Sequence, residues 1–202
     1  TFLGMSQELM NPDIDPDIIQ SSKYLYLTGY LWDTESQKKA VLNALDEAKK
    51  REIKVALSLS DPFCVTRHKE DFISLLKGYA SMVFCNQEEA FTLLDTKITQ
   101  KAVETLSDWT ETVALTIGAY GALISHQGET CYIDPLPVRV EDTTGAGDAF
   151  AAGFLYGMTH NMSPLDSGRI GATLAAAVIE QTGPRYLGNV RKLIQEKQGI
   201  II

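Results

Sequence analysis

The sequence has no surplus of basic residues and no long hydrophobic run. Lys and Arg number 18 against 26 Asp and Glu, which gives a formal net charge of −8 at pH 7. Because a surface that binds nucleic acid or an anionic membrane is basic, we expect neither of these partners. No apolar run approaches the ~20 residues needed to cross a bilayer. The first residues show no basic segment followed by an apolar one, so no signal peptide is predicted.

Cysteine is scarce as well. Cys64, Cys85 and Cys131 are widely spaced and form no C-x-x-C pair, which excludes the usual zinc and dithiol motifs. We therefore expect reduced, mostly buried thiols in a cytoplasmic protein. The sequence also has no G-x-x-x-x-G-K-[ST] string and no G-x-G-x-x-G after its first predicted strand. These absences exclude a P-loop protein and disfavour a Rossmann dinucleotide site.

What is present is ordinary globular composition, with 45% hydrophobic and 22% charged residues. Apolar runs alternate with amphipathic stretches along the first half of the chain. Strands are predicted over residues 24–30, 54–60, 81–85 and 112–117, and helices over 34–51, 71–76, 88–94 and 101–106. This alternation is typical of a parallel sheet with helices on its faces.

The second half of the chain has a different pattern. The run Gln127-Gly128 between residues 122–126 and 129–133 predicts a β-hairpin. A short extended piece is predicted over 138–140, followed by helices over 149–158, 164–180 and 187–197. No linker or repeat interrupts the chain, so we expect one domain over residues 1–202.

The stretch from Asp142 to Phe154, D-T-T-G-A-G-D-A-F-A-A-G-F, joins a strand end to an apolar helix. Gly145, Ala146 and Gly147 can turn tightly with their N–H groups outward, at a helix N-terminus that favours anions such as phosphate. Asp148 would repel such an anion, so its presence favours a base that accepts the proton of a hydroxyl attacking phosphorus. Alternatively, Asp148 only caps the helix and the glycines only form a turn. The complete string makes this interpretation the weaker one.

Two shorter motifs precede this stretch. Asn86 and Glu89 form N-x-x-E directly after a predicted strand, and Thr116, Gly118 and Gly121 form T-x-G-x-x-G after another. Alone, N-x-x-E is equally typical of the solvated start of a helix. T-x-G-x-x-G alone is more typical of a turn that ends a strand. In open α/β sheets, however, ligands bind at the carboxyl ends of the parallel strands.

Together, these motifs resemble those of the ribokinase-like (PfkB) carbohydrate and nucleoside kinases, in order and spacing. The resemblance implies a three-layer α/β/α fold with a mostly parallel central sheet. It also implies ATP as phosphoryl donor and a sugar or nucleoside as the small-molecule acceptor. Residues 57–63 are most similar to the adenosine-kinase-like subgroup. Residues 1–4 are similar to a strand from the middle of the family's chain, so a strand is expected there. The family's N-terminal strands, most of its lid and its Gly-Gly motif have no counterpart here, so we expect the C-terminal portion of a family chain.

The resemblance also implies roles for individual residues. Asp148 would be the base, and Gly145, Ala146 and Gly147 the anion hole. Asn86 and Glu89 would position Mg²⁺ through water, and Thr116, Gly118 and Gly121 would line the nucleotide site. Ala172 and Ala176 would lie beside the adenine, while carbonyls near Asp142, Thr144 and Gly183 would hold a monovalent cation such as K⁺.

Two questions remain open from the sequence. The first is the oligomeric state: the resemblance implies a homodimer as one alternative, since dimers of the family usually form through the lid. The rival function is a non-catalytic nucleotide sensor or scaffold that keeps the anion hole, but a sensor gains nothing from a carboxylate at Asp148.

Overall fold

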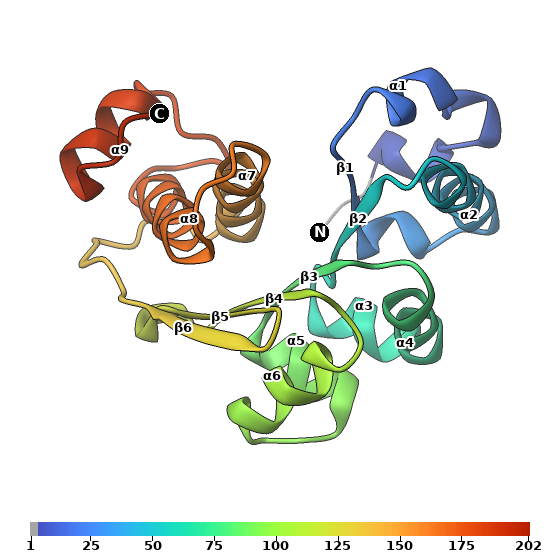
Figure 1. Cartoon of the computed structure of the whole chain (residues 1–202), viewed down its shortest axis with the longest axis horizontal. Helices are drawn as coiled ribbons and strands as arrows, with labels where there is room; N and C mark the ends of the chain where they lie inside the picture. The colour runs from blue at the N-terminus through green and yellow to red at the C-terminus, as the bar shows by residue number, and fades with distance from the viewer. Residues whose placement is uncertain (1–3) are drawn as a thin grey trace. The chain divides into compact units, whose positions relative to one another are not determined.

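A computed structural model describes residues 4–202 (Figure 1). The strand expected over residues 1–4 lies outside the described residues except for Gly4, which begins a short 3₁₀ helix, η1 (Gly4–Glu8). The chain divides into two compact units between Val113 and Ala114, and each unit is described by itself. Within the described residues, no helix has the length and apolar character that spanning a bilayer requires.

The first unit alternates strands and helices. After η1 come η2 (Asn11–Asp13), α1 (Pro16–Gln20), β1 (Tyr24–Thr28), η3 (Gly29–Trp32), α2 (Glu35–Lys50), β2 (Lys54–Ser58), α3 (Pro62–Arg67), α4 (Lys69–Gly78), β3 (Met82–Asn86), α5 (Gln87–Leu94) and α6 (Thr99–Ser107). The strand β4 (Thr112–Thr116) begins in this unit and ends in the next.

The second unit continues with η4 (Gly118–Tyr120), β5 (Ala122–His126), β6 (Glu129–Ile133), α7 (Ala146–Thr159), α8 (Pro164–Ile179) and α9 (Val190–Gln198). The strands follow the order β1-β2-β3-β4-β5-β6 in one sheet. β1, β2 and β3 are parallel, with Tyr24 opposite Lys54 and Ala56 opposite Met82, whereas β5 and β6 are antiparallel. The expected α/β class with a mostly parallel sheet is confirmed.

Local sequence signals account for the best-predicted elements. The capping box of α2 is present: the Gln37 N–H donates to Thr34 Oγ1 at 3.2 Å, and the Thr34 N–H to Gln37 Oε1 at 2.9 Å. The hairpin turn holds Gln127 and Gly128 at φ values of 50° and 85°, as a tight two-residue turn requires. In α8, the Asp166 N–H donates to Ser163 Oγ at 3.0 Å, which confirms Ser163 as the N-cap.

Small residues let α7 pack closely on α8. A Cβ on Gly153 would lie 2.8 Å from the Gly171 Cα, and one on Gly157 would lie 2.4 Å from Ser167 Oγ. The same helix α8 also contacts β5 and β6. These contacts fix α7 on the rest of its unit, and with it the loop from which α7 starts.

The structure corrects several expected boundaries. The first strand ends two residues earlier than predicted, because η3 begins at Gly29. Gly29 also lies close to the segment after β2: a Cβ at this position would lie 2.9 Å from the Leu59 carbonyl oxygen. The second strand ends at Ser58, and Ser60 turns away with φ 75°. The helix α3 was not predicted, and residues 138–140 belong to no strand of the described chain.

Candidate active site

The loop before α7 is held in place by a close contact between two backbone segments. Gly145 is the N-cap of α7 and has φ 82°, the left-handed region that favours glycine. A Cβ at this position would lie 2.7 Å from the carbonyl oxygen of Pro184. Only glycine fits here without a shift of the backbone, so Gly145 fixes the start of α7 against the segment that follows α8.

Asp142 joins the same two segments through hydrogen bonds. Its Oδ1 accepts the Thr144 N–H at 2.9 Å, and its Oδ2 accepts the Gly183 N–H at 3.1 Å. The hydrogen bonds from Thr144, followed by that from Gly183, lower the pKa of Asp142. The structure thus brings together all three residues expected around a monovalent cation.

The first turn of α7 presents N–H groups without protein acceptors. Among the described residues, the N–H groups of Gly145 and Gly147 have no protein partner, whereas Ala146 donates to the Thr143 carbonyl at 3.2 Å. A Cβ on Gly147 would meet no heavy atom within 4 Å, so the space beside this residue is open. The Ala146 N–H is therefore committed to the turn, unlike the other two donors.

Asp148 lies in this first turn and is exposed. Its carboxylate forms no hydrogen bond or ion pair with any described residue, and the α7 N-terminus has no side-chain cap. The interpretation of Asp148 as a helix cap therefore has no contact to support it. A carboxylate in this place is free to meet a ligand.

The motif at Thr116 forms a tight turn after β4. The Ile117 N–H donates to the Gly121 carbonyl at 2.7 Å, and Gly118 and Gly121 have φ values of 56° and 81°. A Cβ on Gly121 would lie 2.1 Å from the Ile133 carbonyl oxygen and 3.1 Å from the Pro135 nitrogen. This turn is thus packed against the end of β6.

A cavity of about 340 Å³ lies beside that end of β6. It is lined by Tyr132, Ile133, Asp134, Pro135, Leu136, Arg169, Ala172, Lys197 and Gln198. Ligand cavities usually have volumes of ~300–1,000 Å³, and this one lies near the lower end of that range. Ala172 lies in its wall, and Ala176 is one helical turn further along α8.

In the first unit, Asn86 and Glu89 form a closed pair at the start of α5. Glu89 Oε2 accepts the Asn86 N–H at 2.9 Å, and Oε1 accepts the Asn86 Nδ2–H at 2.7 Å. Asn86 Oδ1 in turn accepts the Glu89 N–H at 2.8 Å. These three contacts fix both side chains at the carboxyl end of β3.

Glu89 is only 5% exposed. Burial raises the pKa of its carboxyl group from 4.5 to about 7, against the lowering effect of the Asn86 N–H, and the charge of Asp61 raises it further. A buried carboxylate of this kind is stabilised by a cation. The described residues contain no group of three or more His, Cys, Asp or Glu that could hold a metal by themselves.

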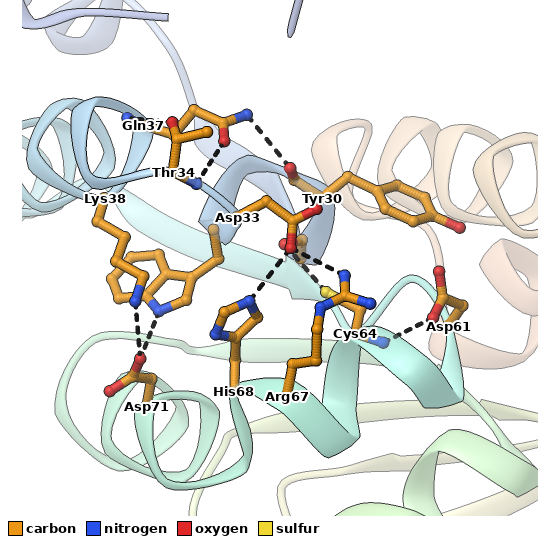
Figure 2. Close-up of polar contacts among 12 residues, drawn as sticks. Tyr30, Asp33, Thr34, Gln37, Lys38, Asp61, Cys64, Arg67, His68 and Asp71 are labelled. Carbon is orange, nitrogen blue, oxygen red and sulfur yellow. Dashed lines mark hydrogen bonds and ion pairs between the residues drawn. The ribbon is translucent and has the colours of Figure 1, made fainter. Parts of the chain in front are cut away.

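A polar network fixes the loops after β1 and β2 (Figure 2). Asp33 Oδ1 accepts hydrogen bonds from Arg67 at 2.8 Å and, in the donating tautomer, from His68 at 3.2 Å. Asp61 Oδ1 accepts the Cys64 N–H at 2.7 Å and so caps α3. The network ties the segment after β1 to α3, which starts at the carboxyl end of β2.

Several residues of these arrangements are not predicted from the sequence. Pro184 has no sequence signal for its contact with Gly145, because that contact depends on two distant segments. Lys197 and Gln198 line the cavity because α9 packs on α8, and Arg169 lines it because α8 contacts β6. Asp61 had a usable signal, since it directly follows a predicted strand and precedes a proline.

Comparison with known proteins places these features in a family. The model of the pfkB family carbohydrate kinase matches residues 4–189. A protein from Archaeoglobus fulgidus described as an uncharacterized sugar kinase is 27% identical over 186 residues, which cover 90% of this chain and 71% of the relative.

Solved structures agree with this assignment. The adenosine kinase from Sinorhizobium meliloti has 34% sequence identity and a TM-score of 0.90, over 94% of this chain and 58% of that protein. A putative ribokinase II from E. coli, in complex with ATP and Mg²⁺, shares the fold at 15% identity and a TM-score of 0.83, over 92% of this chain and 62% of that protein. The chain spans about half the length of other curated relatives it matches (53% and 54%). The ribokinase-like fold expected from the sequence is thus confirmed.

Proposed function

The chain belongs to the pfkB family of carbohydrate kinases, and we propose from this premise that it transfers the γ-phosphoryl group of ATP to a hydroxyl of a sugar or nucleoside. The observation that carries the proposal is the free carboxylate of Asp148 beside open backbone N–H groups at the start of α7. Such an arrangement can remove a proton and stabilise negative charge at one place.

Asp148 is the base in this proposal. The acceptor hydroxyl gives its proton to the Asp148 carboxylate while its oxygen attacks the γ-phosphorus, and the bond from phosphorus to the β,γ-bridging oxygen breaks. ADP leaves with the electron pair of that bond. The exposure of Asp148 and its lack of a described protein partner support this role, since a carboxylate used as a cap would already be engaged.

The open N–H groups would hold the charge of the transferred group. Gly145 and Gly147 have N–H groups without described protein acceptors, and the space at Gly147 is open. Ala146 contributes by shaping the turn, because its own N–H is bonded to Thr143. Removing one donor of this kind typically costs ~10²–10³ in rate.

Mg²⁺ fits the pair formed by Asn86 and Glu89. The buried Glu89 carboxylate is an oxygen donor whose charge lacks a cationic partner among its described contacts, and Mg²⁺ prefers such hard oxygen ligands together with water and phosphate. When bound with ATP, the ion would neutralise charge on the triphosphate. Asn86 would orient Glu89, because its N–H and Nδ2–H bond both carboxylate oxygens.

We place the nucleotide in the second unit. Thr116, Gly118 and Gly121 would line its path, and the cavity with Ala172 in its wall, followed by Ala176, would take the adenine. K⁺ would be held by backbone carbonyls near Asp142, Thr144 and Gly183. The hydrogen bonds that Asp142 accepts from the Thr144 and Gly183 N–H groups support such a site, because they bring these two segments together.

The cellular location and the partners of the protein are proposed from the same family membership. We expect a cytoplasmic enzyme without nucleic-acid or membrane partners, consistent with the net charge of −8 and the free cysteines Cys64, Cys85 and Cys131. A homodimer remains an expectation that sedimentation of the full protein would test.

The experiment is a phosphoryl-transfer assay of the full protein with ATP and Mg²⁺ against a panel of sugars, sugar acids and nucleosides. We expect ADP release that depends on one class of acceptor, with a phosphomonoester product visible by ³¹P NMR. Nucleotide binding without transfer to any acceptor would support the rival function of a sensor.

A further inference from the structure

The turn after β4, residues 116–121, is tied to β6 by a side-chain hydrogen bond. Within the turn, the Ile117 N–H donates to the Gly121 carbonyl at 2.7 Å, and the Tyr120 N–H donates to the Ile117 carbonyl at 3.0 Å. The Tyr120 carbonyl in turn accepts the Tyr132 hydroxyl at 2.6 Å. The Tyr132 hydroxyl thus adds a bond from β6 to the bonds that the turn makes internally.

The rest of the turn has few contacts that fix its conformation. At one end, Gly121 approaches the Ile133 carbonyl so closely that a Cβ would overlap with it. At the other end, Gly118 has φ 56°, and a Cβ there would meet no heavy atom within 4 Å. The side chain of Tyr120 is 74% exposed, so it does little to anchor the turn. Because glycine loses more conformational freedom on ordering than other residues, a turn with two glycines at positive φ depends on ties to its surroundings.

Tyr132 makes its bond from a rigid element. It lies opposite Leu123 in the antiparallel pair of β5 and β6. The next residue, Ile133, is only 2% exposed, and successive side chains of a strand point to opposite faces. The burial of Ile133 therefore fixes the face on which Tyr132 lies. A tyrosine has only two side-chain torsions, so holding its hydroxyl in place costs little entropy.

We propose that Tyr132 is a positioning residue for the nucleotide, whose hydroxyl holds the turn in the conformation that lines the nucleotide path. The inference rests on the proposed function, because it takes Thr116, Gly118 and Gly121 as residues of that path. It assigns a role to a strand residue outside the motifs of the family resemblance. Without the hydroxyl, only a fraction of the molecules keeps the turn in its binding conformation, and the measured affinity falls by that fraction.

The test is Tyr132→Phe in the full protein, which removes one oxygen atom and keeps the ring. Calorimetric titration with Mg·ATP should show binding weaker by about three- to tenfold, the range expected for the loss of one hydrogen bond. In the phosphoryl-transfer assay, the KM for ATP should rise to the same extent, while kcat and the KM for the acceptor stay within about twofold. The matched control is Tyr79→Phe, which removes a hydroxyl that donates to Asp46 Oδ1 at 3.1 Å in the first unit. It should leave all of these values within about twofold.

Hydrogen exchange separates positioning from a direct contact with the nucleotide. In the nucleotide-free protein, the peptide that contains residues 116–121 should exchange at least about threefold faster in Tyr132→Phe, because the turn opens more often. The same peptide should exchange at an unchanged rate in Tyr79→Phe. A Tyr132 hydroxyl that only contacts the nucleotide would weaken binding without any change in this exchange.

The outcomes are distinguishable. An unchanged affinity for ATP in Tyr132→Phe, or unchanged exchange of the turn, overturns the inference. A lower melting temperature with an unchanged affinity for ATP gives Tyr132 a merely structural role and also overturns it. Each of these results leaves the kinase proposal standing. Binding of ATP without transfer to any acceptor overturns the kinase proposal alone, because the comparison of affinities still decides the inference. A protein that binds no nucleotide overturns both.

Discussion

Gly145 and Pro184 approach so closely that a single added methyl group would lie 2.7 Å from the Pro184 carbonyl oxygen. Together with the two hydrogen bonds that Asp142 accepts from Thr144 and Gly183, this contact joins the loop before α7 to the segment after α8. The N–H groups proposed for phosphate thus have a fixed backbone behind them. Pre-set donors of this kind are effective because they need not reorganise during the reaction.

The first prediction concerns this contact. Gly145→Ala should lower the free energy of unfolding by about 2–4 kcal/mol, because it combines a left-handed φ of 82° with overpacking against Pro184. Urea denaturation followed by circular dichroism measures the change. The matched control is Gly147→Ala, where a Cβ has open space, and it should be neutral or stabilise by up to about 1 kcal/mol. Equal effects of the two substitutions would show that the Pro184 contact is not tight.

The second prediction concerns Glu89 and pH. Burial raises the pKa of its carboxyl group from 4.5 to about 7. Between these two pH values the carboxyl group is therefore protonated in the folded state and ionised in the unfolded state. Stability from this group is present below pH 4.5 and is lost as the pH rises to about 7. Without Mg²⁺, Glu89→Gln should therefore become more stable than the unaltered protein as the pH rises, by an amount on the order of 3 kcal/mol at pH 8.

The control for this prediction is Glu88→Gln, which makes the same change at an exposed neighbour on α5. Glutamine can keep the capping box with Asn86, so the α5 start should survive in Glu89→Gln. In the assay with ATP, the same substitution should raise the Mg²⁺ concentration needed for half-maximal rate. A pH-independent difference in stability would contradict the buried, protonated state of Glu89.

The third prediction concerns the thiols. Cys64 is fully buried and burial raises its pKa to about 12, while burial also raises the pKa of Cys85. At pH 8 a thiol with a pKa of about 12 is ~0.01% thiolate, against ~10% for a pKa of 9. Iodoacetamide should therefore modify only the half-buried Cys131 in the native protein, and slowly, as mass spectrometry of peptides would report. Labelling of Cys64 before denaturant is added would contradict the described packing.

Much of the fold could be predicted from local patterns. The Gln127-Gly128 turn and the capping box at Thr34 specify their elements within a few residues, and the structure keeps both. The helix α3 was missed because its six residues bury only Cys64 and Val65, too few to show a helical period. Its one signal is Asp61 before Pro62, a pair that is equally typical of the end of the preceding strand.

The candidate site also has one part that the sequence predicts and another that it does not. Asp148 and the neighbouring glycines lie in one continuous string, so the sequence alone predicts them as candidates. The contact of Gly145 with Pro184 and the bond from Tyr132 to Tyr120 join segments that are separate in the sequence, and no local pattern records them. The roles assigned to these residues remain predictions for experiment.

The central claim is that Asp148 is the base, and Asp148→Asn tests it most directly. Asparagine keeps the size and removes the basicity, and no described contact of the carboxylate is lost. The measurement is steady-state phosphoryl transfer in the full protein with its best acceptor, together with ATP affinity and thermal melting. Glu141→Gln, which also removes one negative charge from this loop, is the control and should keep near-normal turnover. For Asp148→Asn we expect unchanged melting, equal or slightly tighter ATP binding, and a loss of ~10²–10⁴ in kcat. Near-normal turnover in that variant would contradict the proposed mechanism.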